Sequence, residues 1–244
     1  MPLGAASGWK VPAEDAPHRA TYMQWPVSRR VYGYDGFLDD VQATIARAAN
    51  AIAEFEPVIL LADRDDHAGA RRLVSSGVEL WDVPTEDLWA RDAGPLFATN
   101  GVDMRVQSLN FNGWGGKQVH RRDSRIAGRV AEILDLTLAP SPLVGEPGGV
   151  DHHGDTLIAH ESSWLINNRN PGIDLTEITE HLNAAYGTSR VIWAPGLAGQ
   201  DITDYHIDSL ARLTAPGRVL INLPDEPDPR DPFHQAALET HDIL

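Results

Sequence analysis

The spacing of apolar residues along the chain predicts alternating helices and strands. Residues 37–55 place apolar side chains three and four positions apart, the spacing of an amphipathic helix packed on a sheet. Pro57 ends this helix, and the continuous apolar run at 58–62 predicts a short buried strand. By the same reasoning we expect helices at 67–76, 123–134 and 175–186, and strands at 78–83, 190–194 and 218–223.

One arrangement of these elements recurs. Apolar runs separated by a loop with an acidic residue occur within 78–97, 136–160 and 190–222. Asn100 and Gly101 add a hairpin between 96–99 and 105–109, so a repeated ββαβ-like unit fits better than a doubly wound parallel sheet. Because copies of one supersecondary unit can direct equivalent loops to a common axis, we expect the acidic loops to converge.

Composition narrows the choice of partners. The chain has 244 residues, 42% of them hydrophobic, and a formal net charge of −15, which argues against nucleic acid as a partner. The charge is compatible with a cationic small molecule, although many acidic proteins owe such a charge to solubility alone. No apolar run is long enough for a membrane, and residues 1–18 carry no export signal, so we expect a cytoplasmic location.

The sequence contains no cysteine. This absence excludes disulfides, thiolate metal sites and a cysteine nucleophile supplied by these residues.

Asp92 is the first candidate for a functional carboxylate. In the segment Trp89 to Pro95, WARDAGP, Gly94 and Pro95 impose a turn directly after it. A rigid loop of this kind presents a carboxylate at a fixed place. The alternative is a structural Arg91–Asp92 pair that serves local hydrogen bonding.

His206 and Asp208 form the second candidate, in the segment YHIDSL. If this segment is extended, residues two apart point to the same side, so both would face one cavity while Ile207 enters the core. A histidine exchanges protons near neutral pH, and a neighbouring carboxylate binds cations and raises the histidine pKa. The alternative is an ordinary surface His–Asp pair.

The segment 145–156 offers a third candidate and a competing chemistry. Glu146 precedes Gly148 and Gly149, which permit close approach of the backbone. The same region has residue types found in metal-dependent phosphoesterases, namely Asp151, His152, His153, Asp155 and His160. That hypothesis requires further aspartate motifs in the N-terminal half, where the available aspartates stand in unsuitable contexts.

Trp114 lies in a glycine-rich segment, FNGWGGK, at 111–117. Its ring could stack on the alkyl chain or the cation of a substrate. The segment is not a phosphate-binding loop, because the required spacing and the following Ser or Thr are missing. A loop with packed aromatic residues is the structural alternative.

Taken together, six segments resemble the agmatine deiminase and bacterial peptidylarginine deiminase family, which has the pentein fold, a five-bladed α/β propeller. In chain order they are TYMQWP at 21–26, WARDAGP at 89–95, FNGWGGK at 111–117, EPGG at 146–149, NNRNP at 167–171 and TDYHID at 203–208. Each is short, but their order along nearly the whole chain is specific to that family.

The resemblance implies a hydrolase that converts a guanidinium group into a ureido group and releases ammonia. In the archetypal reaction agmatine yields N-carbamoylputrescine, a step of polyamine metabolism. The resemblance assigns Asp92 and Asp208 to the guanidinium nitrogens and proton transfer to His206. It places Glu146 and Trp114 in the same substrate site. A cysteine near the C-terminus attacks the central carbon and forms a thiouronium intermediate, and neither metal nor cofactor takes part.

Three departures from the family pattern matter. The chain ends without the cysteine, Pro147 stands between Glu146 and the glycine pair, and Tyr205 stands where a glycine commonly precedes the histidine. We therefore expect one pentein domain over 1–244, truncated at its C-terminus to about three of five blades and inactive alone. The alternatives are an inactive binding module for arginine-like cations and a peptidylarginine deiminase-like activity. The sequence does not decide whether the chain forms a homo-oligomer.

Overall fold

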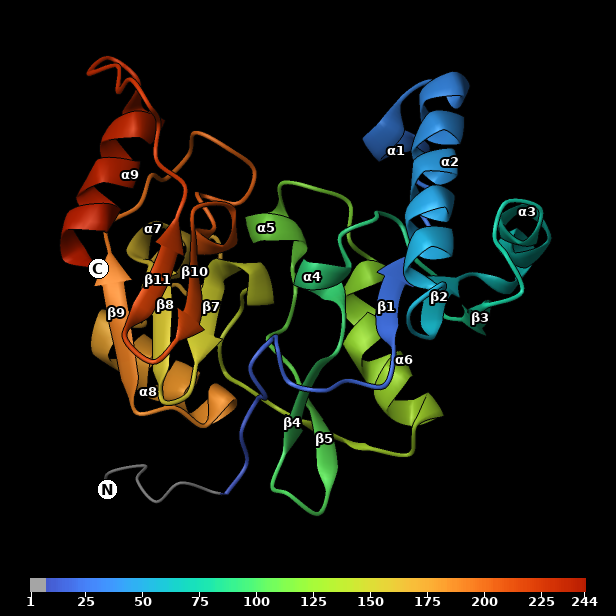
Figure 1. Cartoon of the computed structure of the whole chain (residues 1–244), viewed down its shortest axis with the longest axis horizontal. Coiled ribbons are helices and arrows are strands. Elements are labelled where there is room, and N and C mark those ends of the chain that lie inside the picture. The colour runs from blue at the N-terminus through green and yellow to red at the C-terminus, as the bar shows by residue number, and fades with distance from the viewer. Residues whose placement is uncertain (1–7) are drawn as a thin grey trace.

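The computed structural model describes residues 8–244, apart from the side chain of Asp35. Residues 1–7, part of the N-terminal stretch in which no export signal is expected, lie outside the described residues. Three three-stranded sheets and one two-stranded hairpin follow one another along the chain, with helices between them (Figure 1). Among the described residues, no helix combines the length and apolar character needed to cross a bilayer.

The first sheet is parallel throughout. It consists of β1 (Thr21–Gln24), β2 (Val58–Ala62) and β3 (Val78–Asp82), in that order. Helices α1 (Arg29–Tyr32) and α2 (Asp35–Ile52) join β1 to β2, and α3 (His67–Arg71) joins β2 to β3. Because each connection is a helical crossover, this sheet is βαβαβ rather than the expected ββαβ. All five residues of β2 are buried, as the apolar run predicts.

The second and third sheets confirm the ββαβ unit. In the second, β4 (Leu96–Thr99) and β5 (Met104–Gln107) form the expected antiparallel hairpin, and β6 (Thr137–Ala139) pairs parallel to β5 after α5 (Gly113–Gly116) and α6 (Ile126–Ile133). In the third, β7 (Val150–His153) and β8 (Thr156–His160) are antiparallel. After α7 (Glu161–Trp164) and α8 (Leu175–Tyr186), β9 (Arg190–Ala194) pairs parallel to β8.

The final hairpin, β10 (Ala211–Ala215) and β11 (Arg218–Ile221), is followed by an irregular segment and α9 (Pro232–Ile243). The proline-rich stretch 224–231 is a loop, and the Asp231 side chain caps α9 by accepting a hydrogen bond from the Phe233 amide. Helix α8 ends as predicted at Gly187, whose φ of 72° a glycine adopts without strain. Helix α3 is shorter than expected, because the Ala70 carbonyl accepts from both Leu73 and Val74 in a tightened last turn.

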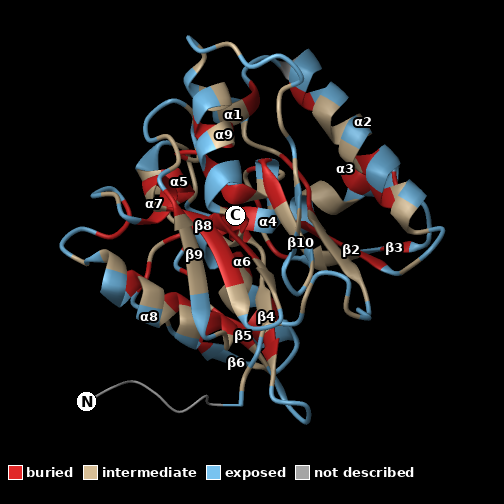
Figure 2. Cartoon of the chain, turned by 60° about the vertical axis from the view of Figure 1, so that its left-hand side comes forward, coloured by how far each residue is buried: buried red, intermediate tan, exposed pale blue. Residues whose placement is uncertain are grey.

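The core lies between each sheet and its helices. Apolar residues of α2 and α3 pack on the first sheet, α8 packs on the third, and α9 packs against the third sheet and the final hairpin. Figure 2 shows the buried residues gathered where the sheets meet, whereas the outward faces of α2 and α8 carry exposed residues. The one-turn segments α4 (Ala90–Ala93), η3 (Pro147–Gly149) and η4 (Ile207–Ser209) contact one another in succession at this centre.

Candidate active site

Three of the predicted site residues converge on Gly148. A Cβ atom added to Gly148 would lie 2.4 Å from Oδ1 of Asp92, 2.8 Å from Nδ1 of His206 and 2.9 Å from Oδ2 of Asp208. Asp92 lies on α4, Asp208 lies in the turn η4 with His206 directly before it, and Gly148 lies in η3, so three one-turn segments meet at this point. The expected convergence of acidic loops is therefore present in the fold.

Asp92 is fixed on the one-turn helix α4. Gly94 follows this turn, and a Cβ there would lie only 2.3 Å from the Ala90 carbonyl oxygen, so the turn requires glycine at that position. Arg91 points away and pairs with Glu14 rather than with Asp92. The alternative of a local Arg91–Asp92 pair is therefore wrong, and the Asp92 carboxylate, 6% exposed, is directed inward.

The segment around His206 is not extended as predicted. Residues Ile207–Ser209 form a 3₁₀ turn, and Asp204 and Tyr205 before it have left-handed backbones, with φ of 61° and 67°. The Asp201 side chain stabilises this bend by accepting hydrogen bonds from the backbone amides of Thr203 and Tyr205. The sequence pattern could not show this local hydrogen bonding. Ile207 is nevertheless buried, as expected.

Tyr205 has a packing role in this bend. Its ring stacks on His160 with centroids 4.7 Å apart and contacts Phe233 edge-on. His160 in turn bonds the Tyr205 carbonyl through Nδ1 and Thr240 through Nε2.

Glu146 lies beside His206 and is wholly engaged. Its Oε2 is 3.1 Å from Nε2 of His206, and Nε of Arg169 donates to both of its oxygens, at 3.1 and 3.0 Å. Pro147 occupies the first position of η3, where no backbone donor is needed, so it is compatible with a Glu146 side chain held in the site. Glu146 is 1% exposed.

Burial and neighbouring charges shift the proton affinities of this cluster. Burial, with the nearby carboxylates of Glu146 and Asp208, raises the pKa of Asp92 to about 6, although His206 and a hydrogen bond from Trp114 oppose the shift. Burial likewise raises the pKa of Asp208, against the attraction of His206, Arg212 and Arg91.

For His206, burial opposes the charged imidazolium, but the hydrogen bond to Glu146 and the surrounding carboxylates outweigh it. The net effect raises the pKa of His206. The site therefore favours a protonated histidine among carboxylates, a charge distribution suited to binding a further cation.

Trp114 contacts Asp92 through its indole nitrogen. Nε1 donates to Oδ2 of Asp92 at 3.1 Å, and the ring packs edge-on against Phe111. Trp114 is 2% exposed and has a left-handed backbone, with φ of 55° between two glycines that share this conformation.

The cluster has three further members that the sequence patterns do not identify: Arg169, Asp204 and Lys117. Arg169 lies in the NNRNP segment, which contributed to the resemblance but to no chemical argument. Its guanidinium is buried and bonds Glu146, Asp204 and the Thr203 carbonyl. Apolar residues directly before NNRNP indicate that this segment enters the core. A charged side chain seldom lies in a core without partners, so this was the available sign that Arg169 forms buried ion pairs.

The residues of the metal hypothesis do not come together. Asp151 bonds Arg212 and the Leu213 amide, Asp155 pairs with Lys10, and His152 bonds backbone carbonyls at 11 and 12. His160 is used in the packing around Tyr205. Among residues 8–244, no three histidine or acidic side chains are arranged to hold a metal ion.

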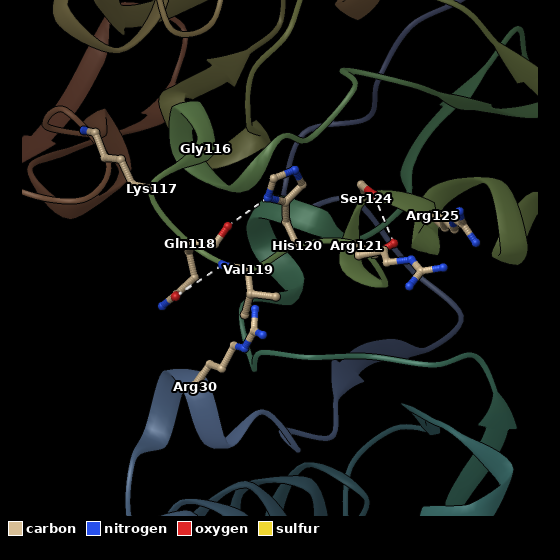
Figure 3. A pocket seen from close by; sticks show the side chains of 9 residues that line it. All are labelled: Arg30, Gly116, Lys117, Gln118, Val119, His120, Arg121, Ser124 and Arg125. Atoms are coloured by element: carbon tan, nitrogen blue, oxygen red, sulfur yellow. Dashed lines mark hydrogen bonds between the residues drawn. The ribbon is translucent and has the colours of Figure 1, made fainter.

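One cavity lies outside this cluster. It measures about 660 Å³ between α1 and the segment 116–125, and Figure 3 shows the basic side chains that surround it. Arg30, Arg121 and Arg125 line it, and no acidic residue does. Such a cavity repels a guanidinium ion, so we place the candidate active site at Gly148.

Comparisons with known proteins agree with the fold and with the family resemblance of the sequence. Residues 10–244 match the model of the Porphyromonas-type peptidyl-arginine deiminase family. A putative agmatine deiminase of Streptomyces avermitilis is 33% identical over 258 aligned residues, which cover 100% of this chain and 73% of the relative. An agmatine deiminase of Ectopseudomonas mendocina is 35% identical, over 96% of this chain and 66% of its own length.

Solved structures show the same fold. The agmatine deiminase of Enterococcus faecalis superposes with a TM-score of 0.88 at 25% identity, over 99% of this chain and 68% of that structure. A putative agmatine deiminase superposes with a TM-score of 0.87 at 28% identity. The expected pentein-type α/β fold is confirmed, and the chain belongs to the family of Porphyromonas-type peptidyl-arginine deiminases.

Proposed function

We propose that this chain binds the guanidinium group of agmatine, or of a related arginine derivative, beside Gly148 for conversion to a ureido group. The observation that carries the proposal is the approach of Asp92, His206 and Asp208 to the one residue there that has no side chain. Because a Cβ atom at 148 would lie less than 3.0 Å from all three groups, the absence of a side chain there is what lets them gather at one point, where a planar cation could bridge the carboxylates.

Two carboxylates have hydrogen-bonding capacity left for a ligand. Oδ1 of Asp92 is buried and has no hydrogen-bond partner among the described residues. A planar guanidinium offers paired N–H donors, and its charge-assisted bonds to carboxylates are among the strongest hydrogen bonds in proteins. Because both oxygens of Glu146 are already engaged, we assign guanidinium binding to Asp92 and Asp208.

Glu146 supports His206 instead. It fixes Nε2 of the imidazole, which leaves Nδ1 facing the space beside Gly148 and 3.5 Å from Oδ1 of Asp92. A histidine held through one nitrogen by a carboxylate can exchange a proton through the other. In this role Nδ1 donates a proton to the departing ammonia and later accepts one from water.

The central carbon of a guanidinium is deactivated by delocalisation, so attack requires a strong nucleophile. The resemblance assigns that role to a cysteine, which these 244 residues do not contain. We therefore propose that the chain by itself binds the cation without turning it over by the covalent route.

Agmatine is the first substrate to test, because several proteins that this chain resembles carry the name agmatine deiminase or putative agmatine deiminase. Arginine and peptidyl-arginine share the guanidinium group and differ only in the remainder of the ligand. Comparing the three measures the contribution of that remainder.

Titration calorimetry at pH 8 tests the proposal. Agmatine is expected to bind the 244-residue chain, and Asp208→Asn is expected to weaken binding at least about tenfold, since one charge-assisted contact is lost. Asp155→Asn, which removes an exposed carboxylate paired with Lys10, is the matched control and should bind normally. No binding by the folded wild-type chain would refute the proposal.

An assay for the ureido product tests the second part. We expect no product from the purified chain. Product formed by it at a rate abolished in His206→Ala would contradict the proposed need for an external thiolate.

A further inference from the structure

The candidate active site is one part of a circuit that consists of ion pairs, one hydrogen bond and the backbone between Trp114 and Lys117. From Asp92 the contacts pass to His206, Glu146, Arg169, Asp204 and Lys117. Lys117 directly follows α5, the segment that also carries Trp114, and Trp114 bonds back to Asp92. With His206 protonated, the six charges alternate in sign around this circuit.

Arg169 connects the two acidic residues Glu146 and Asp204. Its side chain is 0% exposed. Nε donates to both oxygens of Glu146, Nη1 lies 2.6 Å from Oδ2 of Asp204, and Nη2 donates to the Thr203 carbonyl at 3.1 Å. One rigid guanidinium therefore fixes both the carboxylate that holds His206 and the bend that precedes His206 in the chain.

Asp204 and Lys117 complete the support for Arg169. Nζ of Lys117 lies 2.7 Å from Oδ2 of Asp204 and donates to the carbonyls of Asp201 and Ile202. Lys117 also lines the basic cavity (Figure 3), so it lies between that cavity and the buried ion pairs. Burial opposes ionisation of Asp204, but its bonds to Lys117 and Arg169 outweigh that effect and lower the pKa of Asp204.

We propose that Arg169 is a positioning residue that holds Glu146 against Nε2 of His206, and that Asp204 and Lys117 hold Arg169 in turn. A carboxylate with a free side-chain torsion would serve His206 poorly, because hydrogen bonds weaken steeply with distance and angle. Fixing both Glu146 oxygens on Nε of Arg169 removes this freedom. The inference concerns the site of the proposed function and rests on that assignment for its catalytic meaning.

A purely structural role would also explain a buried ion pair, so the test must separate the two roles. The measurement is the titration of the His206 imidazole by NMR in the ligand-free chain. It reports the Glu146–His206 contact directly and needs no substrate. Failure of the inference therefore differs from failure of the proposed function, which shows as absence of agmatine binding.

Arg169→Lys is the first variant. Lysine keeps the positive charge but has a single ammonium group in place of the planar guanidinium with its several N–H donors. It therefore cannot hold Glu146 and Asp204 together as arginine does. We expect His206 to lose proton affinity roughly tenfold, about the effect of one weakened hydrogen bond to a charged group. Glu146→Gln is expected to shift the titration in the same direction.

The double variant Arg169→Lys/Glu146→Gln completes a double-mutant cycle. If Arg169 acts through Glu146, Arg169→Lys has no further effect on His206 once Glu146 is replaced by Gln. An unchanged His206 titration in Arg169→Lys with a lowered unfolding temperature would show a merely structural residue and overturn the inference. An equal shift in the Glu146→Gln background would also overturn it.

Asp204→Asn provides a second route should Arg169→Lys fail to fold. Its matched control is Asp201→Asn, which removes the same charge from the same loop. Among the described residues, the Asp201 side chain accepts hydrogen bonds from Thr203 and Tyr205 alone. We expect His206 to lose more proton affinity in Asp204→Asn than in the control. Equal titrations would contradict the support assigned to Asp204.

Discussion

The indole nitrogen of Trp114 donates a hydrogen bond to Oδ2 of Asp92 at 3.1 Å, whereas Oδ1 of the same carboxylate has no hydrogen-bond partner among the described residues. The protein thus holds one oxygen of the Asp92 carboxylate, the group proposed to bind a guanidinium, and leaves the other oxygen available for a hydrogen bond. This bond stabilises the carboxylate form and opposes the rise that burial causes in the pKa of Asp92.

Replacing Trp114 by Phe removes the donor while keeping an aromatic ring. Because the pKa of Asp92 is about 6, we expect agmatine binding by the wild type to weaken as pH falls through about 6. In Trp114→Phe this loss should begin about one pH unit higher, since one hydrogen bond to the charged form is gone. Calorimetry from pH 5 to pH 9 measures both curves.

Trp164→Phe is the control for that experiment. Trp164 is also buried, but its indole nitrogen bonds the Gly149 carbonyl rather than a carboxylate. Trp164→Phe should lower the stability of the protein but leave unchanged the pH at which agmatine binding weakens. A common displacement in both variants would rule out the direct effect on Asp92.

Gly148→Ala tests whether the close approach of the three side chains to Gly148 is needed for binding. Gly148 is not among the residues with a left-handed backbone, so alanine brings a methyl group without backbone strain. That methyl would meet atoms of Asp92, His206 and Asp208 within 3 Å, so agmatine binding should fall at least about tenfold and stability by about 1–3 kcal/mol. Calorimetry and urea unfolding measure the two effects.

Gly128→Ala is the matched control, since its methyl would have only Leu138 nearby, at 3.7 Å, in helix α6. It should bind normally. Normal agmatine binding by Gly148→Ala as well would place the ligand elsewhere.

Asp92→Asn is expected to abolish agmatine binding and to raise the free energy of unfolding at pH 8. A buried carboxyl with a raised pKa contributes stability at low pH that is lost as pH rises through its folded value, about 6 for Asp92. The asparagine cannot ionise, so at pH 8 the variant should be more stable than the wild type by about 1–2 kcal/mol and should not bind agmatine. Urea unfolding at pH 5 and pH 8 checks the sign: a variant less stable at both values contradicts the expectation.

Asp123 allows a separate test of the same principle away from the ligand. It accepts hydrogen bonds from the amides of Glu86 and Asp87, and burial raises its pKa to about 7. Its contribution to stability should therefore be present at pH 4 and lost as pH rises through 7. Asp123→Asn should lack this decrease in the free energy of unfolding. The variant should therefore be less stable than the wild type at pH 5 and approach it at pH 8.5. A constant difference between the two proteins would contradict the assignment.

The sequence predicted the elements with strong periodicity. The helix ending at Gly187, the strand 58–62 and the hairpin around Asn100-Gly101 lie where expected, because apolar spacing and turn residues act locally. It could not predict that the first sheet is wholly parallel. That choice depends on which strands pair after the helices have packed, and it is not encoded in either strand alone.

The sequence also identified the groups near Gly148, but it could not assign all their partners. Motif order pointed to Asp92, Glu146, His206 and Asp208, whereas the extended segment expected around His206 is a 3₁₀ turn after two left-handed residues. The support of Glu146 by Arg169 joins residues 23 positions apart. Such a contact leaves no periodic trace, because neither side chain affects the local backbone of the other.

The amino-acid sequence by itself determined the family, most elements and the residue types available for chemistry, including the absence of cysteine. Only the tertiary structure decided which carboxylates remain free for a ligand and which are engaged. The reason is that hydrogen-bonding capacity is a property of distances and burial. Once the sheets have packed together, both oxygens of Glu146 have hydrogen-bond partners, whereas Oδ1 of Asp92 has no hydrogen-bond partner among residues 8–244.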